Sequence, residues 1–173
     1  MKANLLVTYE PAHRSRAMQE VRLLLEEIDE KAEFEESDSE GVFLLSVSDS
    51  KHVVRRLAGL CNDDPEKFKY TQRWVPLEKW VSSDVEQIAT ALAEMNDRID
   101  DGEKWKMDLA KRGYDSLSTT ELIKRLTESI DKPKVDLKNP DKIVKVEILG
   151  SKAAIALLNS GELLEVAKMK GRQ

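Results

Sequence analysis

The stretch Lys134–Leu149, KVDLKNPDKIVKVEIL, decides how the second half of the chain folds. Its last part, VKVEI at 144–148, alternates branched apolar residues with lysine and glutamate, which is typical of a strand with one buried and one solvated face. The tripeptide Asn139-Pro140-Asp141 predicts a turn, because proline sets φ and Asn and Asp bond back to the local backbone. We therefore expect a turn followed by a strand whose charged residues face solvent.

Lysines are dense around this turn. Within twelve residues the chain carries four of them, Lys134, Lys138, Lys142 and Lys145. A short apolar segment with Val135 and Leu137 comes just before the turn. Positive charges held along a rigid turn and strand form a basic edge that can bind phosphate groups.

The composition indicates a globular chain of one domain or two small ones. The 173 residues are 40% hydrophobic and 35% charged, with a net charge of −5, and no apolar run approaches the roughly 20 residues that span a bilayer. The single cysteine, Cys61, excludes internal disulfides and fits a reducing compartment. We expect a cytoplasmic protein with no membrane association.

The charge is distributed unevenly along the chain. Residues 20–40 hold ten acidic and two basic side chains, whereas residues 104–152 hold twelve basic and eight acidic ones. An acidic protein can still bind nucleic acid through one positive face. The alternative is that both runs are only solvated surfaces, and the charge pattern by itself leaves this open.

The first half of the chain predicts a ferredoxin-like unit. Strands are expected at 5–7, around Phe34, at 42–47 and at 68–76, with amphipathic helices after Pro11 and after a cap at Ser50. The resulting order, β-α-β-β-α-β, covers about 80 residues and predicts a domain at 1–80.

The second half predicts alternating helices and strands. After a linker at 77–82, Ser83 and Glu86 have capping-box spacing before a helix. A strand at 105–109, a helix at 118–130 and the stretch Lys134–Leu149 follow. Two further strands are expected at 152–158 and 163–166, although 153–158 could also be helical. Trp74 and Trp105 are expected in the core. Trp80, in the linker, is expected either to pack at the domain interface or to stack on a base, and packing is favoured.

No arrangement of side chains indicates catalysis. The histidines, His13 and His52, lie in different elements, and neither forms a zinc-ligand spacing with Cys61. The sequence has no glycine-rich phosphate loop and no nucleophile elbow. We expect no catalytic residue, no metal site and no cofactor.

The pattern K-V-D-L-x-N-P-D-x-x-V-x-V-E-I resembles the signature of THUMP domains, an RNA-binding module of several tRNA-modifying enzymes. A strand closing in Lys111-Arg112 and a helix at 118–130 agree with this resemblance, which covers 81–173 well and the N-terminal half weakly. It implies an α+β protein in which the ferredoxin-like βαββαβ unit precedes an α/β THUMP domain with a mixed sheet at 81–173. In such proteins the pair forms a composite surface for the acceptor end of tRNA.

The resemblance also implies a role. Related enzymes carry a catalytic domain after the THUMP unit, and this chain ends about where such a domain would begin. The chain is therefore similar to the adaptor subfamily that helps a tRNA acetyltransferase form N4-acetylcytidine, with tRNA and that enzyme as partners. The alternatives are a subunit or fragment of another tRNA-modifying enzyme of the methyltransferase, thiolation or pseudouridine type, or an interaction module that does not bind RNA.

The expected RNA contacts are basic or polar residues near the strand ends. Lys111 and Arg112 match the basic strand end of the family, and Gly113 after them would let the backbone approach RNA. Asn139 is expected to fold the turn as well. The full set is expected to converge into one positive patch and comprises Arg73, Lys106, Lys111, Arg112, Lys134, Lys138, Asn139 and Lys142.

Overall fold

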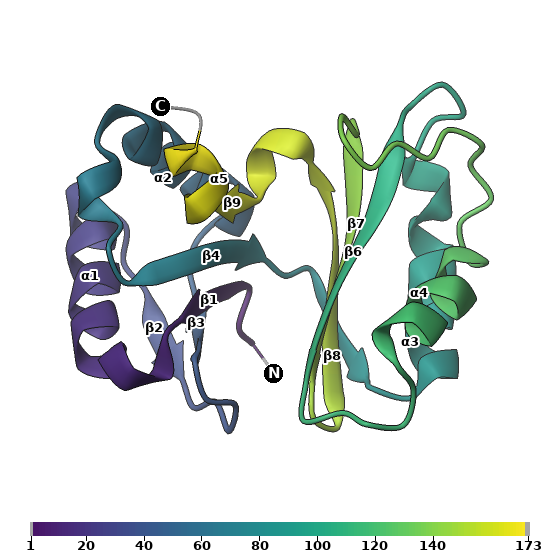
Figure 1. Cartoon of the computed structure of the whole chain (residues 1–173), viewed down its shortest axis with the longest axis horizontal. Coiled ribbons are helices and arrows are strands. Elements are labelled where there is room, and N and C mark those ends of the chain that lie inside the picture. The colour runs from purple at the N-terminus through teal and green to yellow at the C-terminus, as the bar shows by residue number, and fades with distance from the viewer. Residues whose placement is uncertain (1, 172–173) are drawn as a thin grey trace. The chain divides into compact units, whose positions relative to one another are not determined.

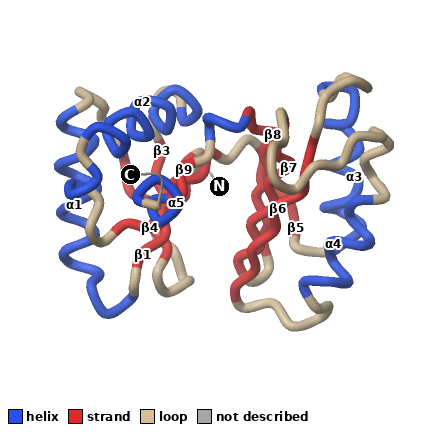
Figure 2. Tube along the Cα trace, turned by 45° about the horizontal axis from the view of Figure 1, so that its top comes forward, coloured by secondary structure: helices blue, strands red, loops and turns tan. Residues whose placement is uncertain are grey.

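The computed structural model describes residues 2–171 and has an α+β fold with two sheets (Figures 1 and 2). The chain divides into two compact units, which we call the first unit (residues 2–77 with 161–171) and the second unit (Glu78–Ser160). The strands are β1 Leu5–Tyr9, β2 Glu33–Glu35, β3 Val42–Ser46, β4 Thr71–Pro76, β5 Lys79–Ser82, β6 Trp105–Arg112, β7 Lys142–Leu149, β8 Lys152–Asn159 and β9 Leu164–Glu165. The α-helices are α1 Arg14–Glu27, α2 Ser50–Asp63, α3 Val85–Met95, α4 Thr119–Thr127 and α5 Val166–Lys170.

The first unit has the predicted ferredoxin-like topology. Its antiparallel sheet has the order β2-β3-β1-β4-β9, so that β1, with the apolar sequence LLVTY, lies between β3 and β4. Alternate residues of β1, such as Leu5 and Val7, join the core cluster to which α1 and α2 contribute their apolar faces. Trp74 is fully buried in this core, as predicted.

The C-terminal segment returns to the first unit. Strand β9 pairs with β4 through Trp74–Leu164 and Arg73–Glu165, and Leu164 and Val166 belong to the first core cluster. The strand expected at 163–166 is present, but it does not extend the second sheet as the sequence pattern led us to expect. The range 81–173 therefore includes residues that pack in the first unit.

The second unit is a four-stranded mixed sheet covered on one face by α3 and α4 (Figure 1). Its order is β5-β8-β7-β6, with β6 and β7 parallel and joined by the crossover through α4. The segment 152–158 is a strand and not a helix. The predicted linker at 77–82 instead contributes β5, which pairs with β8.

The helix caps confirm one prediction and correct two. The Ser118 Oγ accepts a hydrogen bond from the backbone N–H of Glu121 at the start of α4. For α3, the cap is Asp84 and not Ser83, because the Asp84 carboxylate accepts the first N–H groups of the helix. For α2, the cap is likewise Asp49 and not Ser50.

Strand β7 is buried on both faces, which contradicts the solvated face predicted for it. Lys145 is 0% exposed and Glu147 is 1% exposed. The Lys145 Nζ lies 2.9 Å from the Glu147 Oε1 and 3.4 Å from the Asp108 Oδ1. A buried charge is tolerated when an opposite charge and hydrogen bonds satisfy it. Lys145 therefore neutralises the buried Glu147 carboxylate and is not part of a basic edge.

Candidate nucleic-acid interface

The parallel register of β6 and β7 separates the predicted RNA contacts of the second unit into two groups. Trp105 pairs with Lys142 at one end of the two strands, and Arg112 pairs with Leu149 at the other. Seven residues of strand separate these ends, or about 23 Å at ~3.3 Å per residue. The predicted single patch is therefore wrong, because Lys111 and Arg112 lie at the opposite end of the strands from Lys142.

The first group surrounds the loop before β7, which we call the lysine loop (residues 132–141). Lys134, Lys138 and Asn139 are exposed, and within residues 2–171 neither of these lysines has an ion-pair partner. Lys142 is less available, because its Nζ lies 3.2 Å from the Glu103 Oε2 and donates to the Asn159 Oδ1 at 2.7 Å. Lys104, which the sequence pattern did not single out, also lies at this end of the sheet, with its Nζ near Asp136.

Hydrogen bonds to the start of β6 hold the lysine loop in place. The backbone N–H of Trp105 donates to the Lys134 carbonyl at 2.9 Å, and the N–H of Asp136 donates to the Trp105 carbonyl at the same distance. The N–H of Asp141 donates to the Lys104 carbonyl at 2.7 Å, and the Trp105 Nε1 donates to the Lys132 carbonyl at 3.0 Å. The loop thus presents its lysines from a fixed backbone, which lowers the entropy cost of binding.

Asp136 closes the turn within this loop. Its Oδ1 accepts the backbone N–H groups of Lys138 and Asn139 at 3.0 and 2.9 Å, and the Lys104 Nζ lies 3.8 Å from its Oδ2. The backbone bonds from Asn139 and Lys138, followed by the charge of Lys104, lower the pKa of the Asp136 carboxyl.

We expect the side-chain carboxyl of Asp136 to titrate below its usual pKa of about 3.9. A lowered pKa in the folded state means that its contribution to stability is fully present above the unfolded pKa and is lost as pH falls through the folded pKa. The loop geometry should therefore not change between pH 5 and 8. NMR titration of the Asp136 carboxyl carbon measures this pKa; a value at or above the ordinary one contradicts the expectation.

The second group lies at the C-terminal end of β6. The Lys111 Nζ donates to the Tyr114 carbonyl at 3.0 Å, so that its charge is partly used within the turn. Gly113 has φ of 63°, a left-handed conformation that favours glycine. The turn thus explains this glycine, and its predicted role in RNA approach stays a prediction.

The remaining predicted contacts are in different places. Lys106 is half-buried on β6, on the sheet face opposite Trp105, whose side chain is 2% exposed in the core as predicted. Arg73 is half-buried on β4 of the first unit. Among the predicted contacts, the exposed cations that lie close together are therefore those of the lysine loop, whose backbone is held by hydrogen bonds to β6.

A protein-family model matches most of the second unit. The model described as "THUMP domain" matches residues 82–158, which run from the end of β5 through β8 and include the whole lysine loop. These residues form a THUMP domain. No curated protein matches the chain at a significant level.

Solved structures share the fold of the THUMP domain and of the first unit. The crystal structure of PH1313 from Pyrococcus horikoshii Ot3 matches with a TM-score of 0.66 at 17% identity, over 94% of this chain and 55% of that one. The crystal structure of TrmN from Thermus thermophilus matches with a TM-score of 0.59 at 16% identity, over 88% and 44%. The chain therefore spans about half the length of these proteins, and the similarity concerns the fold.

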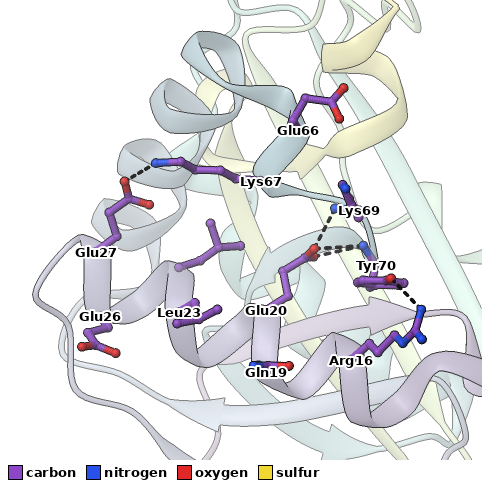
Figure 3. Close-up of a pocket in the computed structure, with 11 residues that line it drawn as sticks. Arg16, Gln19, Glu20, Leu23, Glu26, Glu27, Glu66, Lys67, Lys69 and Tyr70 are labelled. Atoms are coloured by element: carbon purple, nitrogen blue, oxygen red, sulfur yellow. Dashed lines mark hydrogen bonds and ion pairs between the residues drawn. The ribbon is translucent and has the colours of Figure 1, made fainter.

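Outside the THUMP domain, the first unit has a cavity of about 820 Å³ between α1 and the turn before β4 (Figure 3). Its most buried carboxylate is Glu20, which accepts the backbone N–H groups of Lys69, Tyr70 and Thr71 at 2.7–3.2 Å. The Lys67 ammonium pairs with Glu27 at the rim. Because three donors already occupy the Glu20 carboxylate, it holds the turn in place and is poorly suited to accept a proton from a substrate.

We expect Glu20→Ala to lower the free energy of unfolding by about 2–3 kcal/mol, since it leaves backbone donors in a part-buried turn without their charged acceptor. Glu20→Gln keeps one acceptor oxygen and should lose about half as much. Urea unfolding measures both, with exposed Glu26→Ala on the same helix as the control. A Glu20→Ala protein as stable as the control would contradict this role.

Residues 2–171 hold neither a candidate metal site nor a membrane-spanning helix. No cluster of three or more His, Cys, Asp or Glu side chains in this range could hold a metal ion. None of the helices there is both long and apolar enough to cross a bilayer.

Proposed function

We propose that this chain is a tRNA-binding adaptor, which holds tRNA through the lysine loop of its THUMP domain and presents the acceptor end to a separate modifying enzyme. The observation that carries the proposal is the pinned loop with exposed Lys134 and Lys138. The finer part, N4-acetylcytidine formation by a partner acetyltransferase in the cytoplasm, is supported by the sequence resemblance. No catalytic residue of this chain takes part in the proposed reaction.

Electrostatics favours the lysine loop over the rest of the surface. Lysine contacts to phosphates supply most of the affinity of nucleic-acid binding and release counterions, so that affinity falls steeply with salt. The acidic run at 20–40 repels phosphates. In the loop, Asp136 uses its Oδ1 on backbone N–H groups and has the Lys104 ammonium nearby, so that it opposes the lysines only weakly.

The experiment is binding of bulk tRNA across a series of salt concentrations, by filter retention. We expect salt-sensitive binding by the wild-type chain. Lys134→Ala/Lys138→Ala should weaken binding to all tRNAs alike and lower the slope of log K against log salt by about 1.5, since each phosphate contact contributes about 0.7–0.9.

The matched control is Lys31→Ala, which removes an exposed cation from the acidic run and should leave both affinity and slope nearly unchanged. If wild-type binding is absent or insensitive to salt, the RNA-binding function is wrong. If the purified chain alone modifies tRNA when supplied with acetyl-CoA or another cofactor, the adaptor role is wrong and the chain is an enzyme.

A further inference from the structure

The sheet of the second unit ends in a long outer strand, β6. Its eight residues pair with β7 in one unbroken register and include no proline. The other outer strands, β2, β5 and β9, have only three, four and two residues. Proteins protect an open sheet edge with short strands, bulges or proline, because such an edge can pair with a strand of another chain. The edge of β6 has none of these three protections.

Hydrogen bonds within the chain show which backbone groups of β6 point outward. The N–H and the carbonyl of Trp105 both bond to the lysine loop, on the outer side of the strand. The Arg112 carbonyl instead accepts the N–H of Gly150, on the β7 side. Successive residues of a strand point these groups to alternate sides, so odd-numbered residues face outward. Beyond Trp105 no strand of residues 2–171 pairs with this side, and its outward groups belong to Met107, Leu109 and Lys111.

Charges of both signs lie along this edge. Lys106, Asp108, Ala110 and Arg112 share the sheet face opposite Trp105, and all four are half-buried. The Asp108 Oδ1 lies 3.4 Å from the Lys145 Nζ, but a carboxylate has room for about four donors, so this contact does not exhaust it. Opposite charges facing each other across two strands stabilise the pair, and like charges destabilise it. The charges of β6 therefore select how a second strand can align.

Most alignments of a second copy of β6 are unfavourable. A two-fold axis makes the two strands antiparallel and closes the assembly as a dimer. An axis near the start of β6 is blocked, since the lysine loop already pairs there. An axis at Asp108 or at Lys111 places that residue opposite its own copy, with like charges face to face. An axis at Leu109 places Lys106 opposite Arg112, which is again repulsive.

An axis at Ala110 is favourable. The Asp108 carboxylate of each copy then faces the Arg112 guanidinium of the other, which gives two pairs of opposite charge. Leu109 of each copy lies opposite Lys111 of the other, and such residues exchange both backbone hydrogen bonds when their groups point toward each other. The small Ala110 side chains meet at the axis without crowding.

We propose that the outer edge of β6 is a dimerisation surface, on which a second copy of this chain pairs antiparallel about Ala110. This dimer does not depend on the proposed RNA binding. It places Arg112 of the second copy level with Asp108, about 10 Å along the strand from Trp105. In one chain Arg112 and Trp105 are about 23 Å apart, so the dimer brings the second basic group of one copy closer to the lysine loop of the other.

The first test is sedimentation equilibrium of the full chain without RNA. Across about a hundredfold range of protein concentration, we expect a reversible monomer–dimer equilibrium, since dimerisation follows mass action. Hydrogen exchange at the N–H groups of Leu109 and Lys111 should be slower at the high concentration than at the low one. The N–H of Trp105 already donates to the Lys134 carbonyl and should exchange at the same rate at both concentrations.

A cross-link tests the alignment. In the proposed dimer the two Ala110 residues form a pair without hydrogen bonds, whose Cα atoms lie about 4.5 Å apart, so Ala110→Cys should form a disulfide between copies under mild oxidation. Lys106→Cys, on the same face of the same strand, is the matched control. Its two copies would lie about 26 Å apart along the strands and should not link. The native Cys61 is 0% exposed and does not compete.

A change of charge tests the two ion pairs. Arg112→Glu places two carboxylates opposite each other at both ends of the paired segment, and it should weaken dimerisation by about tenfold or more. Lys31→Glu makes the same change of charge at an exposed position of the first unit and should leave the dimerisation constant nearly unchanged.

Each result decides for or against the β6 edge. A wild-type chain that remains monomeric at every concentration overturns the proposal. If the chain dimerises but Lys106→Cys links as fast as Ala110→Cys, or Arg112→Glu dimerises like the wild type, another surface or another alignment holds the copies together and the proposal is wrong. Loss of tRNA binding with the dimer intact would overturn only the proposed function.

Discussion

Lys145→Ala is expected to lower the free energy of unfolding by about 3–5 kcal/mol, because it leaves the buried Glu147 carboxylate without its cation. Glu147 is 1% exposed, and the Lys145 Nζ lies between it and Asp108, 2.9 Å from the Glu147 Oε1 and 3.4 Å from the Asp108 Oδ1. Without that ammonium two carboxylates face each other, one of them inaccessible to water. Urea unfolding followed by circular dichroism measures the loss.

The double variant Lys145→Met/Glu147→Leu removes both buried charges and should recover most of this stability, since apolar replacements of buried ion pairs are often neutral. The matched control is Lys79→Ala. It breaks the Lys79–Glu94 pair, also on the second unit but with both side chains largely exposed, and should cost less than about 1 kcal/mol. A Lys145→Ala protein that loses no more than this control would show that the buried Glu147 carboxylate does not depend on the Lys145 ammonium.

Trp105→Ala is expected to cost about 3–5 kcal/mol, the usual range for removing a buried aromatic side chain. Trp105 is 2% exposed, packs in the core beneath α3 and α4, and donates its Nε1–H to the Lys132 carbonyl. Trp105→Phe keeps most of the ring contacts and should lose about 1–2 kcal/mol through the missing hydrogen bond. Urea unfolding compares the two variants.

A second measurement connects this residue to the lysine loop. Loss of the Trp105 side chain should speed hydrogen exchange at the N–H of Asp136, which donates to the Trp105 carbonyl. Leu137→Ala, which changes an exposed side chain in the same loop, should leave both the stability and this exchange rate unchanged. Equal exchange rates in Trp105→Ala and wild type would show that the loop is held independently of the core.

Local sequence patterns predicted the first unit well. The element order around β1 and β3 follows from short apolar runs broken by Pro11 and Gly41, and the ferredoxin-like order of the sheet agrees with it. The strand β9 was predicted, but its pairing with β4 was not, because a two-residue strand has no pattern that specifies a partner 90 positions earlier. The caps of α2 and α3 are Asp49 and Asp84. They were predicted at the neighbouring Ser50 and Ser83, because serine can also cap a helix.

Two features of the candidate site differ from the sequence-based predictions, namely the burial of Lys145 and the separation of the basic residues along β6 and β7. The alternation at 144–148 predicted solvent for Lys145 and Glu147, and it failed because two opposite charges on one strand face can satisfy each other when buried. The separation of Arg112 from Lys142 could have been predicted. Two strands joined through a helix are normally parallel, and residues at the end of one and the start of the next then lie far apart. The exposure of Val135 and Leu137 could not have been predicted, because apolar residues before a strand usually enter a core.

The return of the C-terminal segment to the first unit reverses the order in which the protein can mature on the ribosome. The edge of β4 and the core around Trp74 stay incomplete until Leu164 and Val166 have been made. The whole of Glu78–Ser160 emerges before them, which takes about 4–17 s at ~5–20 residues per second. The second unit, which contains the THUMP domain, can therefore finish folding while the first unit still lacks β9.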